Sequence, residues 1–305
     1  MSDEINEEII KKLLTHTESL INQIYWFKDD FNFQPSKEHI GAAINYTDIH
    51  ERKDDFLKEV VYTVASWVYS NAKSKKIIDE RLTKVNGDHG NASSFLTTQA
   101  FSKFRPGHPQ GQFGELLLFN FIQYFFGAVP LLRKQRITTS VGHERFGADA
   151  IHFKLEDKKN ILILGESKCY RSEYQFNTAF RTSLESIANS FNNFDKEIDL
   201  YTYDDFIEPE LENIAKLYKA NKLANVHFEL VCLIAYNENN TINGADEIEI
   251  KKSIVSIIQE RCSGLNKDYF TSSDSKIIDR MNYIIFPIWH LDGLLDEFKA
   301  LVGTE

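Results

Sequence analysis

The chain of 305 residues is long enough to bury a sizeable core, as one large domain or two modest ones. Its 42% hydrophobic and 13% aromatic residues exclude a disordered or fibrous protein. Thirty-five Lys and Arg against 45 Asp and Glu give a net charge of −10, which repels a polyanion at long range. Nucleic-acid binding would therefore need a locally basic site or a basic partner.

Cysteine usage and the N-terminal sequence indicate a cytoplasmic protein. The three cysteines show no metal-binding spacing, and their odd number argues against a disulfide framework. The first ten residues, MSDEINEEII, are acidic and lack the apolar core of a signal peptide. No apolar run approaches the roughly 20 residues that a membrane helix needs. We therefore expect no association with a membrane.

The first hundred residues are predicted to be mainly helical. One helix is expected over about Glu4–Phe27, and a polar, proline-containing stretch ends it. A second helical stretch begins near Glu51, with apolar residues spaced by four on one face: Phe56, Val60, Val64 and Val68. Gly, His, Asn and Pro residues over 86–114 indicate a connection. We thus predict a mainly helical region over 1–105 and a second domain over 106–305.

From residue 114 the pattern is that of a layered α/β core. Residues 114–127, GELLLFNFIQYFFG, are apolar on nearly all sides, which predicts a buried helix closed by its final glycine. Turn residues separate three predicted strands at 131–140, 147–155 and 161–170. An amphipathic helix from Phe176 and a strand over 225–236 complete the order helix, three strands, helix, strand.

The remaining residues, 237–305, are predicted to extend this domain with further α/β elements. Isoleucines at helical spacing predict a helix: Ile250, Ile254, Ile257 and Ile258. The segment YIIFPI, residues 283–288, is typical of a short strand, and residues 291–302 are typical of a closing helix.

The tripeptide Glu166-Ser167-Lys168 ends the third core strand. Successive side chains of a strand point to opposite faces, so Glu166 and Lys168 share one face. If the predicted turn over 157–160 is symmetric, the numbers of opposing residues sum to 317. Asp149 then stands opposite Lys168 and on the same face as Glu166.

These residue types suit metal-dependent phosphodiester hydrolysis. Asp149, Glu166 and the backbone carbonyl of Ser167 would hold Mg²⁺ or Mn²⁺, since hard cations prefer oxygen ligands. The metal would polarise the scissile phosphate and lower the pKa of a bound water. Lys168 would orient that water or stabilise charge on the phosphate. Glu115 could supply a further metal ligand. Alternatively, its negative charge could simply be stabilised by the dipole at the N-terminus of the predicted helix.

The Glu-x-Lys tripeptide alone is a weak signal, but its combination with the preceding helix and strand is more specific. A second Glu-x-Lys at 249–251 lies in a predicted helix and follows no core strand, so we reject it. A helix bearing Glu, a strand bearing Asp, a turn and an apolar strand ending in Glu-x-Lys occur here in order. The alternative for Asp149, Glu166 and Lys168 is a salt bridge at a sheet edge.

The order of elements and the motif resemble the PD-(D/E)xK nuclease superfamily over about residues 112–237. Three segments are more narrowly similar to the HamA family, the nuclease subunits of Hachiman anti-phage systems: GELLL at 114–118, FGADA at 146–150 and LGESK at 164–168. The superfamily's proline before the aspartate is replaced by Ala148, a common departure. The resemblance implies a bacterial defence nuclease that acts on DNA with HamB, a superfamily 2 helicase that restrains it.

Three other charged or polar features allow two interpretations each. Residues 131–145 carry a net charge of +3, from Arg133, Lys134, Arg136, Arg145 and Glu144. This segment, with Arg133 and Arg136, could follow a phosphate backbone or be a solvated strand face. Gln175 and Arg181, at the start of the amphipathic helix, could contact DNA or could simply lie on a solvated helix surface. Residues 195–212 hold eight acids and one Lys, which suggests a solvated surface or a site that docks a partner.

Three functions remain open from the sequence. The first is a Mg²⁺-dependent deoxyribonuclease with a helicase partner, and the intact Asp, Glu and Lys favour it. The second is a catalytically silent nuclease-fold module that binds a partner or DNA ends. The third is an RNase toxin of the same fold. No Walker A loop or dinucleotide fingerprint is present, so any use of ATP must belong to a partner.

Overall fold

A seven-stranded mixed sheet forms the centre of the computed structural model, which describes residues 5–104, 109–133, 147–172, 175–201 and 208–303. The strands are β1 (Ile24–Asp29), β2 (His39–Ile44), β5 (Val129–Leu132), β6 (Ala150–Glu156), β7 (Lys159–Tyr170), β8 (Val226–Glu238) and β9 (Met281–Trp289). Their order across the sheet is β1-β2-β9-β8-β7-β6-β5. Short strands β3 (Tyr46–Thr47) and β4 (His50–Glu51) pair separately. The α/β fold class is confirmed.

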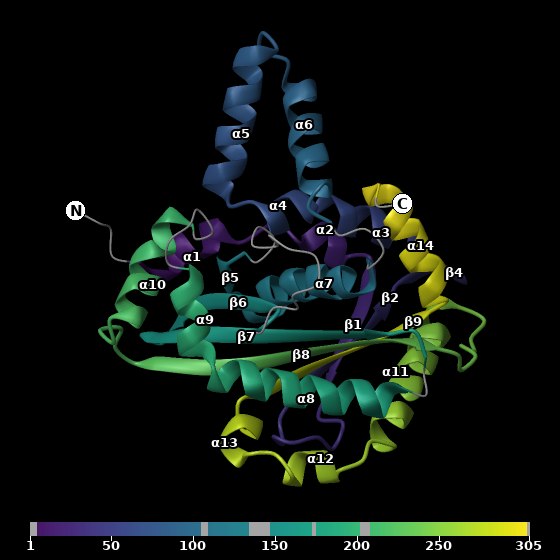
Figure 1. The fold of residues 1–305 in the computed structure, drawn as a ribbon. Helices are drawn as coiled ribbons and strands as arrows, with labels where there is room; N and C mark the ends of the chain where they lie inside the picture. Colours follow the sequence, from purple (N-terminus) through teal and green to yellow (C-terminus); the bar gives the residue numbers. More distant parts are fainter. Residues whose placement is uncertain (1–4, 105–108, 134–146, 173–174, 202–207, 304–305) are drawn as a thin grey trace.

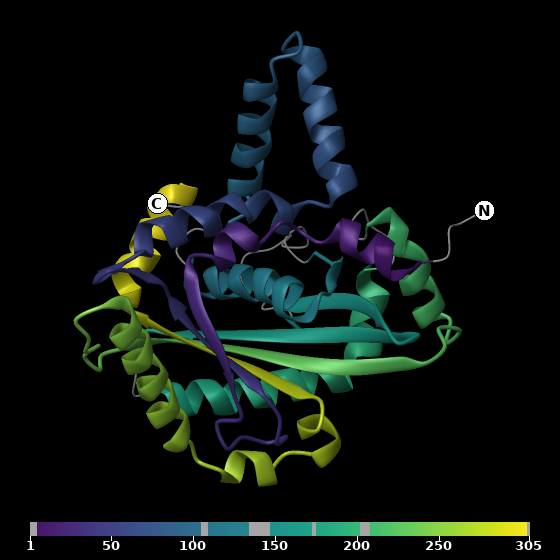
Figure 2. The same ribbon diagram turned by 180° about the vertical axis from the view of Figure 1, so that it is seen from behind.

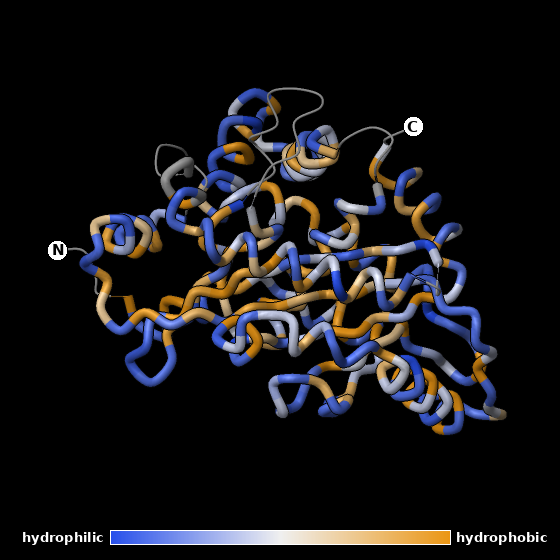
Figure 3. The backbone as a smooth tube through the Cα atoms, turned by 60° about the horizontal axis from the view of Figure 1, so that its bottom comes forward, coloured by the Kyte–Doolittle hydropathy of each residue, from blue (hydrophilic) through white to orange (hydrophobic). Residues whose placement is uncertain are grey.

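Two long helices cover opposite faces of this sheet. Helix α7 (Pro109–Phe126) lies on one face and α8 (Phe176–Asn192) on the other (Figure 1). Strand β7 is apolar on both sides, because Ile163 packs in the cluster with α7 and Leu164 packs in the cluster with α8. Figure 3 shows the hydrophobic colour running along the central strands, while many peripheral turns are hydrophilic.

The predicted order of core elements is confirmed as α7, β5, β6, β7, α8, β8. The buried helix ends as expected at Gly127, which has a φ of 60°. The first predicted strand, 131–140, instead spans Val129–Leu132, and residues 134–146 lie outside the described part of the chain.

The predicted helix over 4–27 is wrong in its second half. The segment forms α1 (Glu7–Leu13), α2 (Glu18–Ile21) and then strand β1. Strand β1 is antiparallel to β2, and β2 is parallel to β9. The aromatic and β-branched residues IYWFKD thus pair in the sheet, and this long-range pairing overrides the local helical pattern. The first 105 residues therefore supply one edge of the same central sheet.

The other N-terminal helices lie above α7 and end in a projection. The expected apolar stripe is buried in α3 (Lys53–Tyr62) and α4 (Val64–Val68). Helices α5 (Asn71–Lys84) and α6 (His89–Phe101) form a hairpin that projects from the body of the molecule (Figures 1 and 2). Helix α5 has no buried residue, so this hairpin is a surface feature.

The C-terminal elements complete the sheet and its covering layers. Helix α11 (Glu247–Ser263) buries all four predicted isoleucines, β9 inserts between β8 and β2, and α14 (Leu291–Val302) closes the fold. The shorter elements are α9 (Phe194–Tyr201), η3 (Pro209–Leu211), α10 (Glu212–Lys219), α12 (Asp268–Thr271) and α13 (Ser275–Ile278). No described helix is both long and apolar enough to cross a membrane.

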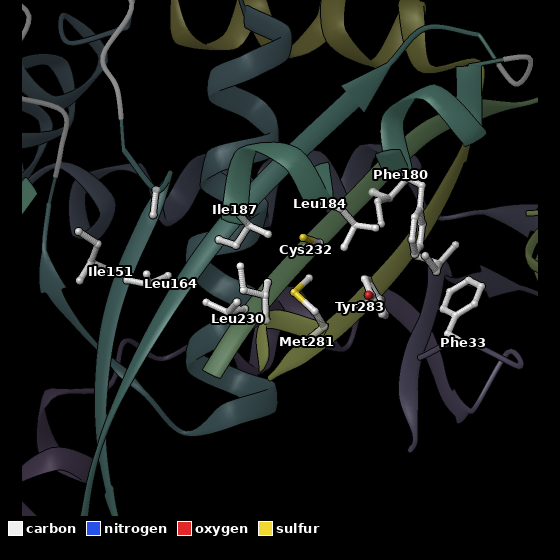
Figure 4. Packing of buried hydrophobic residues seen from close by; sticks show 14 of the residues in the cluster. Phe33, Ile151, Leu164, Phe180, Leu184, Ile187, Leu230, Cys232, Met281 and Tyr283 are labelled. Carbon is white, nitrogen blue, oxygen red and sulfur yellow. The ribbon is translucent and has the colours of Figure 1, made fainter. Parts of the chain in front are cut away.

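The core beneath α8 joins residues that are far apart in the sequence. Leu184 and Ile187 of α8 lie over Cys232 of β8 in Figure 4, and Phe33 approaches from the N-terminal region. The ring centroids of Phe33 and Phe180 are 5.1 Å apart in an edge-to-face arrangement. This packing fixes α8 against the strands that carry the candidate site.

Candidate active site

Strand β7 extends beyond its neighbour β6 and so has an open edge. The two strands pair from Glu156 and Lys159 up to Ala150 and Gly165. Strand β7 then continues to Tyr170, and in the described part of the chain residues 166–170 are paired only with β8. The predicted tripeptide lies on this one-sided extension, where backbone groups on the β6 side are available to other partners.

The observed register differs by two residues from the prediction. Ala150 stands opposite Gly165, so opposing residue numbers sum to 315 and not 317. The turn is a tight one at Asp157 and Lys158, whose φ angles are 49° and 61°, as in a two-residue hairpin loop. Asp149 precedes the first paired residue of β6, and this register brings it beside Glu166 rather than opposite Lys168; its charge acts on the Glu166 carboxyl.

Asp149 is held in place by the backbone and side chain of Ser167. Its Oδ2 accepts hydrogen bonds from the Ser167 N–H at 2.8 Å and from Ser167 Oγ at 3.2 Å. The carboxylate thereby continues the pattern of strand hydrogen bonds past the start of β6. Gly147, two residues earlier, has a φ of 132°, a conformation that other residues rarely adopt. This explains the glycine in the FGADA segment.

Glu166 is buried, and only one of its two carboxylate oxygens makes an ordinary hydrogen bond. Its side chain is 4% exposed, and Oε1 accepts a hydrogen bond from Lys168 Nζ at 2.7 Å. Its Oε2 is also buried and makes no hydrogen bond of ordinary length and angle with a described residue, although the side chain of Ser186 on α8 acts as a hydrogen-bonding neighbour of the carboxylate. Burial raises the pKa of Glu166 to about 7, and the charge of Asp149 acts in the same direction, whereas Lys168 opposes them.

Lys168 keeps its charge in this setting. Burial lowers the pKa of Lys168, but the negative charge of Glu166 and their hydrogen bond outweigh burial, so the pKa is raised overall. The side chain of Lys168 is 27% exposed, compared with 4% for Glu166. The ammonium group is thus positive and within reach of an approaching anion.

Glu115 does not complete a three-carboxylate group. It lies on α7, which packs on the face of β7 opposite to Glu166, and it is half-buried. Among the described residues, no three Asp, Glu, His or Cys side chains are close enough together to hold a metal ion. The expectation that Glu115 joins Asp149 and Glu166 as a ligand is therefore not supported by the geometry.

The oxygen atoms at the open edge nevertheless suit a hard divalent cation. Glu166 offers Oε2, which has no hydrogen bond of ordinary geometry with a described residue, and Asp149 offers its second oxygen, because Oδ2 is taken by Ser167. The N–H and C=O of a strand residue point to the same side, so the Ser167 carbonyl also faces the open edge. Two carboxylates and a carbonyl are typical ligands of Mg²⁺ with additional water.

Arg133 is not on a DNA-accessible surface, which contradicts its predicted role. Its side chain is 3% exposed and lies 2.9 Å from Glu208, whose side chain is 1% exposed. Arg133 also donates from Nε to the Ser66 carbonyl at 3.0 Å. No local pattern predicts this pair, because its members are far apart in the chain. Arg136 lies outside the described residues.

The remaining predicted DNA contacts, Gln175 and Arg181, are exposed at or near the start of α8, the helix that covers the face of β7 bearing Glu166. Gln175 is exposed at the N-terminal end of α8. Arg181 is also exposed and pairs with Glu185 at 2.7 Å along the same helix. Of the acidic stretch 195–212, residues 202–207 lie outside the described part, and Glu208 is buried.

The fold and site together define an α/β protein with two carboxylates and a lysine at the open edge of a central strand. The HamA family model matches residues 21–302, which is nearly the whole chain. The chain therefore belongs to the HamA family. Membership implies a component of a Hachiman anti-phage defence system and suggests a partner from that system. A search of curated proteins found no match.

Proposed function

We propose that this chain is the Mg²⁺-dependent DNA nuclease of a Hachiman defence system, built on a PD-(D/E)xK core. The observation that carries the proposal is the grouping of Asp149, Glu166 and Lys168 at the open edge of β7, with one Glu166 oxygen buried and without a hydrogen bond of ordinary geometry among the described residues. The order of helix, three strands, helix and strand supports the assignment of the core.

Each group has a distinct part in the proposed hydrolysis. Asp149, Glu166 and the Ser167 carbonyl would hold Mg²⁺ or Mn²⁺. When bound, the metal supplies polarisation of the phosphate and a lower pKa of its water. Lys168 places a positive charge beside the scissile phosphate, where it stabilises negative charge that develops in the transition state. Burial of Glu166 strengthens these interactions, because little water screens them.

The proposed partner is HamB, a superfamily 2 helicase, and both would act in the cytoplasm on DNA. The net charge of −10 supports the need for a partner, because phosphate contacts dominate the affinity for DNA. The helicase would bring DNA to the nuclease and restrain cleavage until it hydrolyses ATP.

Cleavage of plasmid and linear DNA by the full chain and its helicase tests the proposal. We expect activity with Mg²⁺ or Mn²⁺, poor activity with Ca²⁺, which accepts looser coordination, and none in EDTA. Glu166→Gln and Lys168→Ala should abolish cleavage. Lys216→Ala is the matched control, since Lys216 forms a 2.8 Å pair with Glu212 on an exposed helix surface. Full activity in EDTA or in either site variant would exclude the mechanism.

The same assay separates the two other functions. A silent module would retain DNA binding and show no cleavage with any metal. An RNase would degrade labelled single-stranded RNA and leave DNA of the same sequence intact.

A further inference from the structure

Ser167 contacts the candidate site from the face opposite to its two neighbours in the motif. Glu166 and Lys168 point toward α8, while the Ser167 side chain points toward α7 and is 9% exposed. Both of its donors nevertheless reach the same Asp149 oxygen, from N at 2.8 Å and from Oγ at 3.2 Å. Asp149 precedes β6 by one residue, so its own backbone lies outside the strand pairing.

Gly114 of α7 provides the space for this hydroxyl. A Cβ atom at residue 114 would lie 3.2 Å from Ser167 Oγ, which is tighter than ordinary van der Waals contact, and 3.4 Å from Ser167 Cβ. A Cβ at Gly111, one turn earlier on α7, would have no atom within 4 Å. A side chain at residue 114 would therefore press on Ser167, whereas one at residue 111 would not.

We propose that Ser167 is a positioning residue for the metal site, held against Gly114 so that its hydroxyl orients Asp149. With Oδ2 bound by both Ser167 donors, the other Asp149 oxygen would be left for the metal. Without the hydroxyl, one donor remains and the carboxylate can rotate. This inference rests on the proposed metal site, and it assigns a role to the middle residue of the Glu-x-Lys motif.

Binding of Mn²⁺ to the full chain without DNA tests the inference, with free Mn²⁺ followed by electron paramagnetic resonance. Ser167→Ala should raise the Kd by about 10- to 100-fold, the usual effect of removing a group that orients a metal ligand. Ser167→Thr retains the hydroxyl and should stay close to the wild-type affinity. Glu166→Gln should lose most binding and serves as the reference for the site itself.

Substitutions on α7 test the contact with Gly114. Gly114→Ala should weaken Mn²⁺ binding by displacing the hydroxyl, whereas the matched variant Gly111→Ala should not. In the Ser167→Ala background, Gly114→Ala should cause little further loss of affinity, because the displaced group is already absent. Additive losses would contradict the proposed contact.

The outcomes distinguish this inference from the proposed function. If Glu166→Gln loses Mn²⁺ binding but Ser167→Ala matches the wild type, the metal site stands and the positioning role is overturned. Equal losses in Ser167→Ala and Ser167→Thr would overturn it too, because the hydroxyl would not be the cause. If the wild type binds no Mn²⁺, the site and the inference both fail. Thermal unfolding in EDTA checks that each variant is folded.

Discussion

Glu166 brings together burial, an ion pair and an oxygen without an ordinary hydrogen bond within one side chain. Its position at the end of an apolar strand places the carboxylate under α8, where water cannot solvate both oxygens. Lys168 satisfies one oxygen, and the second has no hydrogen bond of ordinary geometry among the described residues. A buried charge that is only partly compensated destabilises the folded state, so this carboxylate favours a proton or a metal ion.

The raised pKa of Glu166 predicts that the stability of the metal-free protein depends on pH. Its folded pKa of about 7 lies above the ordinary value of 4.5, so the folded state holds this proton more tightly than the unfolded state. The resulting stabilisation is complete below the unfolded pKa and is lost as the pH rises through the folded pKa. Between about pH 5 and about pH 7.5 the free energy of unfolding should fall further in the wild type than in Glu166→Gln.

Urea unfolding in EDTA measures this difference, and the comparison between variants is essential. Burial lowers the pKa of His39 to about 4 and that of His152 to about 3. These histidines change the stability in the opposite direction. Their contribution to the free energy of unfolding is present above the unfolded pKa and is lost as the pH falls through the folded pKa. Both variants contain them, so the difference isolates Glu166. Parallel pH profiles would show that the Glu166 pKa is not raised.

Among the elements, a buried ion pair joins three segments that are distant in sequence. Arg133 directly follows β5, and Glu208 directly precedes η3. Glu208 also accepts a hydrogen bond from the N–H of Asn71, the first residue of α5, at 3.0 Å. The base of the projecting hairpin is therefore tied to the edge of the sheet through one carboxylate.

Removal of Arg133 should be strongly destabilising. Arg133→Ala leaves Glu208 buried without its cation, and such losses cost about 3–5 kcal/mol. The matched control is Arg181→Ala, because Arg181 forms a 2.7 Å pair that is exposed, and exposed pairs contribute about 0.2–1 kcal/mol. Urea unfolding midpoints of both variants provide the comparison. Similar losses in the two variants would show that burial does not govern the strength of the Arg133 pair.

At the scale of the whole molecule, charge and family membership both indicate action with a partner. The net charge of −10 disfavours unaided binding to DNA, and the HamA family suggests a partner from the Hachiman system. The acidic stretch 195–212 remains a candidate for part of the docking surface. Glu208 is excluded from it by burial, whereas Glu210 and Glu212 are exposed.

We expect the isolated chain to bind duplex DNA weakly and to form a stable complex with the helicase. In that complex, cleavage should be low at rest and should increase when the helicase hydrolyses ATP on DNA. Co-purification followed by cleavage assays with and without ATP tests this expectation. Equal cleavage in both conditions would rule out restraint by the helicase. If the double variant Glu210→Lys, Glu212→Lys still forms the complex, only the assignment of the docking surface to this stretch is wrong.

Local patterns in the sequence were sufficient to predict the α/β class and the order of the core elements. Strand alternation placed Glu166 and Lys168 on one face, where the structure pairs them, and the observed register brings Asp149 beside Glu166. Periodicity and turn chemistry depend on neighbouring residues, so they can be read from a single sequence.

Only the tertiary structure decided which distant segments meet. Strand β1 forms in a segment with a helical pattern because β2 pairs with it and with β9, more than 200 residues further along. Arg133 is buried because Glu208 comes to it from elsewhere in the chain, and Ser167 meets both Asp149 and Gly114 of α7. Such contacts depend on which surfaces exclude water together, and short-range residue patterns do not encode that choice.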